Sequence, residues 1–157
     1  MIFSIRTVRV FAAGFAGASC IGIAHAQAQA QAQAQPVTID SPHPYADTVQ
    51  RLERTIEARG LTLFAKIDHA DAARKAGLTL RPTVVLVFGN PKGGTPLMQA
   101  QPLLAIDLPL KALVWQGDDG KVKVAVNGAE VYKRHGLNDE QAKPLAAASG
   151  MVEAALK

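Results

Sequence analysis

The stretch that decides the fold is KALVWQGDDGKVKVAVN, residues 111–127. Two segments that we expect to be strands, 111–116 and 121–127, flank the sequence Gly-Asp-Asp-Gly. Asp-Gly accepts the positive φ angles that tight hairpin turns require. In the second segment Lys and Val alternate, which is typical of a strand with one face in water. The sequence therefore predicts an antiparallel hairpin here.

Helix and strand patterns alternate before this hairpin. Apolar residues recur at helical spacing over residues 46–59, and Gly60 supplies a helix stop. Residues 61–67 alternate between apolar and other positions, the period of a strand with one buried face. A short Ala-rich helix is expected over residues 69–76, and the continuously apolar residues 83–88 predict a central strand covered on both faces.

The segments between that strand and the hairpin are shorter. Residues 88–96 are rich in Gly and Pro and predict a loop. Thr95 and Pro96 fit the N-cap and the first residue of a helix that ends at Gln101. Residues 103–108 are expected to form a strand.

The C-terminal part of the chain is predicted to be helical. A helical turn is expected to end at residues 132–136. After it, Asn138 with Gln141 matches a capping box, which predicts the start of the last helical region. Pro144 and Gly150 are expected to kink or split that region.

Mixed strands and helices with an antiparallel hairpin favour one architecture. We expect an α+β two-layer sandwich, with one mainly antiparallel sheet and helices packed on one face. It is predicted as a single domain over residues 37–157, because a chain of about 120 residues can bury about two-thirds of its unfolded surface.

Residues 1–26 have the pattern of a signal peptide. Two arginines and no acid precede an apolar run over residues 10–23, and Ala24-His25-Ala26 supplies the small-x-small pattern that a signal peptidase requires. A helix of that run rises only about 21 Å, short of the roughly 30 Å hydrocarbon core, so no stable membrane anchor is predicted. Lipidation at Cys20 is the weaker alternative, because no large aliphatic residue stands three positions before it. Residues 27–36 form a low-complexity Ala/Gln spacer, and we expect a periplasmic or secreted protein.

Composition excludes several classes of function. The 157 residues include 17 Lys and Arg against 13 Asp and Glu, and removal of residues 1–26 leaves 15 against 13, a net charge of +2. No basic cluster with interleaved aromatic residues remains, so no nucleic-acid partner is predicted. The single Cys20 allows neither a disulfide scaffold nor a thiolate cluster, and the His spacing predicts no metal site. No cofactor motif is found.

Asp68 and His69 are the candidate catalytic residues. A carboxylate at a strand end can orient an imidazole for acid or base chemistry. The alternative is that Asp68 caps the helix that follows and His69 is exposed on its first turn. A hydrolase or isomerase would use this pair with Lys92 as the electrophile, which requires the three side chains to converge.

A second candidate site is a Gly-rich segment entering a helix, where backbone N–H groups can favour an anion. It is not a P-loop, because Lys92 precedes the last glycines instead of following them. Two charges in the next apolar stretch are added as possible ligand contacts, although both can be structural, as can Arg134 and His135 near a helix end. The predicted ligand-binding residues are Asn90, Lys92, Gly93, Gly94, Thr95, Asp107 and Lys111.

Five uncommon strings occur in this chain: IDHADAA (67–73), FGNPKGGTPLM (88–98), IDLPLKALVW (106–115), GDDGKV (117–122) and KRHGL (133–137). Their order and spacing resemble the domain-of-unknown-function family 302. The resemblance covers about 110 residues and implies an α+β domain, often exported and often dimeric, without a settled activity. Other branches of the family have cysteines where this chain has Gly89 and Leu110, which argues against thiol chemistry by that route.

These observations favour an exported, non-catalytic domain that binds a small molecule, an anion or an envelope partner. A homodimer is expected, because a sheet with helices on one face leaves an apolar face that short helices do not cover. The alternatives are the small hydrolase or isomerase described above and a structural envelope-stress protein.

The N-terminal pattern gives a direct prediction about processing. We expect the mature chain to begin at Gln27 or within the Gln-Ala repeat, because Ala28 and Ala30 offer competing small-x-small sites. N-terminal sequencing of the exported protein measures this. Recovery of Met1 in the soluble pool would contradict it.

Overall fold

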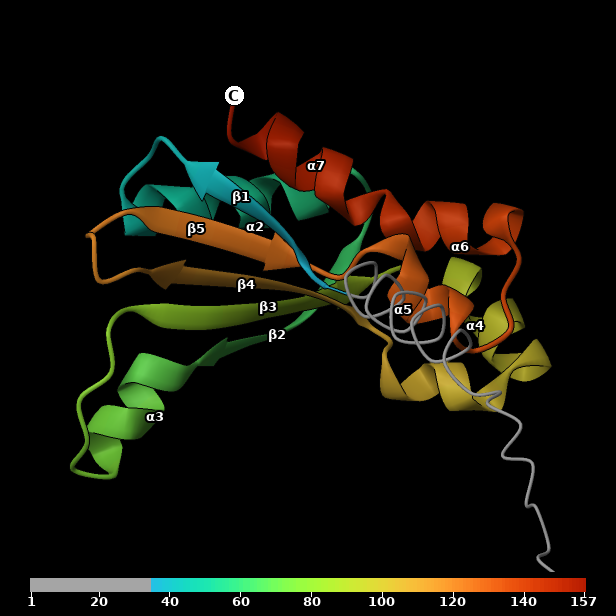
Figure 1. Ribbon diagram of the computed structural model, residues 1–157, viewed down its shortest axis with the longest axis horizontal. Helices are drawn as coiled ribbons and strands as arrows, with labels where there is room; N and C mark the ends of the chain where they lie inside the picture. The colour runs from blue at the N-terminus through green and yellow to red at the C-terminus, as the bar shows by residue number, and fades with distance from the viewer. Residues whose placement is uncertain (1–34) are drawn as a thin grey trace, which may run out of the picture.

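The computed structural model describes residues 35–157 (Figure 1), so the predicted signal peptide and most of the Ala/Gln spacer lie outside the described residues. Strands, α-helices and one 3₁₀-helix, η1, alternate along the described chain. In order, the elements are β1 (Val37–Ser41), α2 (Tyr45–Ala58), β2 (Thr62–Asp68), α3 (His69–Lys75), β3 (Thr83–Gly89), α4 (Pro91–Ala100), η1 (Pro102–Ile106), β4 (Leu110–Gln116), β5 (Val122–Val126), α5 (Ala129–Lys133), α6 (Asp139–Ala146) and α7 (Ala148–Ala155).

All five strands form one antiparallel sheet in the order β1-β5-β4-β3-β2. The predicted hairpin between β4 and β5 is confirmed. Gly117 N–H donates to the carbonyl of Lys121 at 2.8 Å, and Gly120 adopts a φ of +76°, which a glycine reaches without strain. The α+β sandwich with a mainly antiparallel sheet is therefore confirmed.

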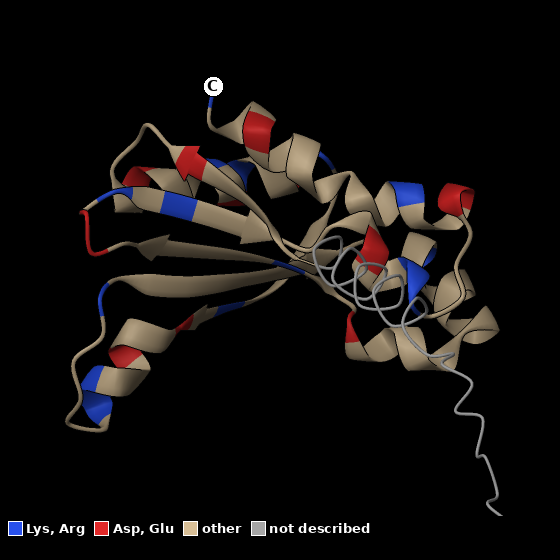
Figure 2. Cartoon of the chain, viewed as in Figure 1, with Lys and Arg blue, Asp and Glu red and all other residues tan. Residues whose placement is uncertain are grey.

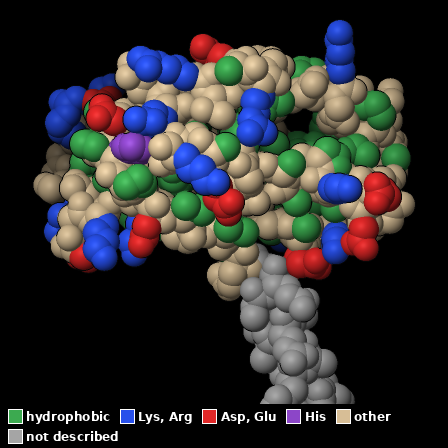
Figure 3. All heavy atoms as spheres, turned by 90° about the horizontal axis from the view of Figure 1, so that it is seen from above, with side chains coloured by type: hydrophobic (Ala, Val, Ile, Leu, Met, Phe, Trp, Pro, Cys, Tyr) green, Lys and Arg blue, Asp and Glu red, His purple; other side chains and the backbone are tan. Residues whose placement is uncertain are grey.

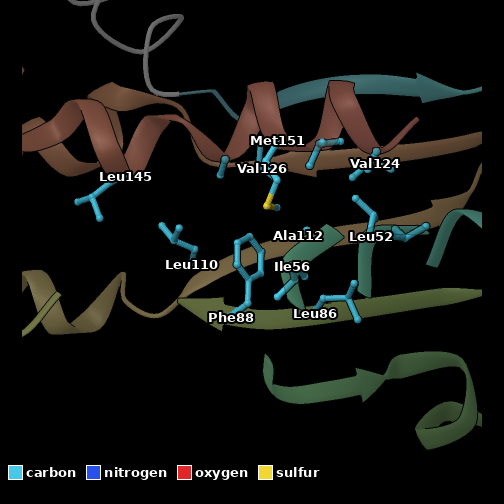
Figure 4. Close-up of a cluster of buried hydrophobic side chains, with 14 of the residues drawn as sticks. Leu52, Ile56, Leu86, Phe88, Leu110, Ala112, Val124, Val126, Leu145 and Met151 are labelled. Carbon is cyan, nitrogen blue, oxygen red and sulfur yellow. The ribbon is translucent and has the colours of Figure 1, made fainter. Parts of the chain in front are cut away.

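Helices α2 and α7 cover one face of this sheet and bury its apolar side chains. Leu86 and Phe88 of β3 are fully buried, and Leu52 and Ile56 of α2 pack against the same cluster. Met151 of α7 closes the cluster from above (Figure 4). Burial along β3, β4 and β5 alternates residue by residue, because neighbouring side chains of a strand point to opposite faces.

The remaining helices lie at the two ends of the sheet. Helix α3 extends from the end where β2 finishes, whereas α4, η1, α5 and α6 gather at the opposite end (Figure 1). These two ends are the places where polar residues and loops can form a site.

Residues 88–96 are not a loop, and Thr95 does not cap the helix. Helix α4 begins at Pro91, and the side chain of Asn90 accepts a hydrogen bond from Lys92 N–H at 3.0 Å. Asn90-Pro91 supplies the same N-cap and first-turn chemistry as Thr95-Pro96, five residues earlier. Thr95 and Pro96 therefore lie inside the helix.

Two strand predictions also need correction. Residues 103–108 form η1 and the turn after it, with Leu104 buried and Leu103 and Ile106 79% and 77% exposed. The two exposed residues are three positions apart, which matches the repeat of a 3₁₀-helix and not that of a strand. The strand over residues 83–88 is central but covered on one face only, and strand β1 was not expected at all.

The helical C-terminal part agrees closely with its prediction. Asn138 accepts from Gln141 N–H at 2.9 Å, and the Gln141 side chain accepts from Asn138 N–H at 3.0 Å, which completes the capping box. The helical region is split at Ala147, between Pro144 and Gly150.

Phe88 provides a test of the core. Phe88→Ala is expected to lower the free energy of unfolding by about 3–5 kcal/mol, because it removes a fully buried ring beneath α2 and α7. Phe64→Ala is the matched control, since Phe64 is 49% exposed and its removal should cost about 1 kcal/mol. Denaturant unfolding of both variants measures the difference. Equal losses would show that Phe88 is not part of the main core.

Candidate functional site

The predicted catalytic residues and the predicted binding segment lie at opposite ends of the sheet. In the antiparallel pair of β2 and β3, Asp68 is opposite Val84 and Thr62 is opposite Gly89. A separation of six strand residues at about 3.4 Å each places Asp68 roughly 20 Å from the end where α4 begins. The convergence of Asp68, His69 and Lys92 that an acid–base mechanism requires is therefore absent.

Asp68 and His69 have local structural surroundings. The Asp68 carboxylate accepts a hydrogen bond from Asp71 N–H at 2.9 Å and caps α3. His69 is the first residue of that helix and is exposed. This is the arrangement expected for a helix cap, and it leaves the two side chains without a shared target.

The opposite end of the sheet contains a cavity of about 510 Å³. Its walls come from the start of β2, the end of β3, helix α4, the segment leading into β4, and helix α6, and they are predominantly apolar. The lining residues are Leu61, Phe64, Gly89, Asn90, Pro91, Gly93, Gly94, Thr95, Leu97, Met98, Leu108, Pro109, Leu110, Pro144 and Leu145.

Two glycines of the lining lie against apolar side chains of the cavity. A Cβ atom on Gly89 would lie 3.7 Å from both the Phe64 ring and Cβ of Pro109. A Cβ atom on Gly94 would lie 3.7 Å from Leu108 Cδ1 and 3.8 Å from Met98 Cε, so a side chain at position 94 would project toward the cavity lining. A Cβ atom at position 89 or 94 would thus be in ordinary van der Waals contact with the cavity lining, whereas one at Gly93 would meet open space.

The predicted ligand-binding residues are only partly brought together. Asn90, Gly93, Gly94 and Thr95 line the cavity, whereas Lys92 is exposed and does not line it. The apolar residues that make up most of the lining were missed by sequence reasoning, which searched for polar groups. These residues are spread from position 61 to position 145, so no short stretch of the sequence indicates the cavity.

The N-terminus of α4 offers no free donor to an anion. Pro91 has no N–H, and Lys92 N–H is held by the Asn90 side chain. The N–H groups of Gly93 and Gly94 donate to the Asn90 carbonyl at 3.0 and 2.9 Å. Because these donors are already satisfied, the segment does not form the anion-binding helix end that the sequence suggested.

A charged cluster lies beside the cavity. The Asp107 carboxylate accepts hydrogen bonds from Arg134 Nη2 at 2.9 and 2.7 Å and pairs with Nε2 of His135. The side chains of Asp107 and His135 are only 14% and 11% exposed. Lys111 does not pair with the Asp107 side chain, and its Nζ instead donates to the carbonyls of Asp107 and Pro109 at 3.1 and 3.2 Å.

The electrostatics of this cluster favour a charged carboxylate. Partial burial alone would raise the pKa of Asp107, but the hydrogen bonds from His135 and Arg134 outweigh it and hold the pKa below the usual 3.8. Nearby, burial raises the pKa of the Tyr132 hydroxyl to about 12, and the Asp107 charge adds to that shift. Tyr132 is therefore a neutral core residue and not an acid or a base near neutral pH.

The Asp107 cluster fixes the wall of the cavity. It ties the end of η1 to the end of α5, and residues Leu108, Pro109 and Leu110 follow Asp107 directly into the lining. Sequence reasoning assigned Arg134 and His135 to a helix end and did not pair them with Asp107, because 27 and 28 residues separate the partners. The one sequence feature that pointed to this cluster was Asp107 itself, an acid in an otherwise apolar stretch.

The described residues contain no grouping of three or more His, Cys, Asp or Glu side chains that could hold a metal ion. Within the same range every buried side-chain N or O atom has a hydrogen-bond partner. The fold and this site define a small α+β domain with an apolar cavity at one end of its sheet.

The chain belongs to the family described as "Domain of unknown function DUF302", whose model matches residues 37–155. The family resemblance described from the sequence is thus confirmed. A structure described as an uncharacterized conserved DUF302 protein from Bacillus stearothermophilus has the same fold, with a TM-score of 0.65, 20% identity, and coverage of 77% of this chain and 94% of that one.

The curated relatives carry this domain within longer proteins. The chain is 38% identical over 120 residues to "Fluoride-specific ion channel FluC 1" of Brucella suis, covering 74% of this chain and 47% of the relative. The match to "Fluoride-specific ion channel FluC 2" of Brucella melitensis has the same identity and covers 44% of that relative. The chain thus spans about half the length of the curated relatives it matches. In residues 35–157 no helix has the length and apolar character needed to span a bilayer.

Asp107→Ala tests the cluster. It should lower the free energy of unfolding by about 1–3 kcal/mol near neutral pH, because the nearly buried His135 side chain loses its partner. Asp118→Ala is the control, since Asp118 pairs with Arg81 but is 98% exposed, and its thermal midpoint should not change.

The pH dependence of this effect follows from the lowered pKa. The contribution of Asp107 is fully present above the usual carboxyl pKa of 3.8 and is lost as the pH falls through the lower folded-state pKa. Denaturant unfolding of wild type and Asp107→Asn across this range measures it. A stability difference that stayed constant down to the most acidic point would contradict the role of the charge.

Proposed function

We propose that this chain is an exported binding domain that holds a small, mainly apolar molecule in the cavity between β2, β3, α4 and α6. The observation that carries the proposal is the cavity itself, about 510 Å³ in volume and lined mostly by Leu, Met, Phe and Pro side chains. Small-molecule sites in proteins have this size and this predominantly apolar lining.

The polar groups of the cavity indicate the kind of ligand. Asn90 and Thr95 lie among the lining residues and are exposed, so they stand where the cavity meets solvent. The Asn90 Oδ1 is engaged by Lys92 N–H, which leaves its amide nitrogen as a donor. A ligand with an apolar body and one polar, hydrogen-bond-accepting end fits this arrangement better than a free anion does.

One wall of the cavity is held rigid, which favours a cavity that stays open for a ligand. The segment Leu108–Leu110 is fixed by the Asp107 cluster on one side and by pairing of β4 on the other. A preformed cavity costs a ligand less ordering entropy than one that must be assembled on binding.

A location at the cell envelope is supported by two observations. The first 26 residues have the composition of a signal peptide. Two Brucella relatives named as ion channels contain a region similar to this chain within a longer protein. The binding domain would then act outside the cytoplasm, next to or attached to membrane proteins.

Filling the cavity tests the proposal. Gly94→Leu places a side chain toward Leu108 and Met98, and it should weaken binding of the apolar fluorescent probe N-phenyl-1-naphthylamine by about tenfold or more. Gly150→Leu is the matched control, because Gly150 is also helical, is exposed, and has open space around its Cβ position. Fluorescence titration measures the dissociation constant of each protein.

The outcomes separate a binding domain from a structural one. Loss of binding in Gly94→Leu alone, with both variants folded by circular dichroism, supports the cavity as the site. Equal binding by wild type and Gly94→Leu, or no binding by wild type, would leave the chain with a structural role in the envelope.

A further inference from the structure

A polar groove lies between α2 and the C-terminal end of α7. Its volume is about 560 Å³, and it shares no lining residue with the apolar cavity at the end of the sheet. Four of its lining residues carry a charge, namely Asp47, Arg51, Arg54 and Lys157. We call it the α2–α7 groove, and its chemistry differs from that of the cavity proposed above as a ligand site.

The charges of the groove come from two elements of the fold. Asp47, Arg51 and Arg54 belong to α2, whereas Lys157 follows α7. Figure 2 shows basic positions on α2 and at the chain end, on the same side of the sheet. That side, seen from above in Figure 3, presents charges of both signs. The character of the groove therefore depends on which of these charges line it.

The three cations of the groove have no counter-charge within the described chain. Asp47 precedes Arg51 by four residues, a spacing at which opposite charges on a helix can pair. Even so, no ion pair of residues 35–157 includes Arg51, Arg54 or Lys157. Glu53, between the two arginines in sequence, instead pairs with Lys66 of β2 at 2.9 Å.

The two arginines can act on one ligand. They are three residues apart, a spacing that places both side chains on the same face of a helix. Both are exposed and line the groove, and Lys157 lines it from the end of α7. Each guanidinium group is a planar fork of N–H donors that matches the oxygen atoms of a phosphate.

We propose that the α2–α7 groove binds a phosphate group. Three cations and one carboxylate leave the charged lining residues with a net charge of +2. A phosphate monoester carries about −1.5 to −2 near neutral pH, so its charge balances that of the lining. Its oxygen atoms are numerous enough to meet both guanidinium groups and the lysine at once.

Other ligands use fewer of these features. A cation is repelled by the net charge of the groove, and an apolar molecule would separate charged side chains from water. A monocarboxylate balances only half of the charge, and its two oxygen atoms are matched by a single guanidinium fork. The Thr55 hydroxyl donates to the Arg51 carbonyl at 2.8 Å, so recognition depends on the cations and not on this hydroxyl.

Calorimetric titration of the full chain with sodium phosphate, at constant ionic strength, tests the proposal. Arg51→Ala and Arg54→Ala should each raise the dissociation constant about tenfold, because each removes a charge-assisted fork. Asp47→Asn should lower it, since the one repelling charge is lost. Alanine has the highest helix propensity, so α2 is expected to form in both arginine variants, with circular dichroism as the check.

Arg59→Ala is the matched control. Arg59 follows α2 directly, is exposed, does not line the groove and forms no ion pair within residues 35–157. The variant removes the same charge from the same helix and should leave phosphate binding unchanged. Arg51→Lys keeps the charge but not the fork, and it should weaken binding by about threefold.

Co-sedimentation with phosphatidylglycerol vesicles identifies the source of the phosphate group. Binding of free phosphate without binding of vesicles indicates a soluble ion or ester. Vesicle binding that is lost in Arg51→Ala and kept in Arg59→Ala assigns the same groove to a lipid headgroup.

Three results would overturn the proposal. Wild type could bind neither free phosphate nor vesicles. Arg51→Ala and Arg54→Ala could bind as tightly as wild type, which would place the site elsewhere. Finally, Arg59→Ala could weaken binding as much as Arg51→Ala does, which would show a diffuse effect of net charge and not a site in the groove.

Discussion

Burial of one face of a five-stranded antiparallel sheet beneath α2 and α7 is the constraint on which the rest of the structure depends. The buried row on β3, β4 and β5 contains only apolar side chains, and the two helices supply Leu52, Ile56 and Met151 against it. Apolar surface removed from water stabilises this layer at about 25 cal/mol per Å². Because side chains alternate along a strand, the same pattern that builds the core also decides what the other face presents.

The antiparallel order explains why the candidate residues separate as they do. Neighbouring strands run in opposite directions, so the C-terminal ends of β2 and β3 lie at opposite ends of the sheet. Asp68 and His69 are thereby kept apart from the segment that follows β3, whatever the conformation of α3. The cavity forms instead where β3 ends and β2 begins, beneath helices from the middle and the end of the chain.

Much of the fold could be predicted from sequence, and the reasons differ by element. The Gly-Asp-Asp-Gly hairpin, helix α2 and the Asn138 capping box depend on local chemistry that the chain displays directly. The start of α4 was placed five residues too late because two Pro-containing caps compete, and sequence does not rank them. Strand β1 is recognisable only through its pairing with β5, at the far end of the chain.

The candidate site was less predictable, because its determinants are distant from one another. Asn90, Gly93, Gly94 and Thr95 were expected at the site for their polarity and backbone freedom, yet apolar residues from four separate segments provide most of its walls. The partners of Asp107 are 27 and 28 residues further along the chain. Charges brought together only by tertiary structure leave no periodicity in the sequence, so the pairing of Asp107 with Arg134 and His135 could not be predicted.

The two outermost strands have a consequence for whether the sheet can grow by adding a strand from another chain. Strand β1 lies between Pro36 and Pro42, and proline has no N–H to offer to a further strand. Strand β2 has an irregular register between Leu63 and Ala65, which twists that border of the sheet. Both borders therefore resist lateral addition of another strand, so the sheet is not expected to extend into a fibre by edge pairing.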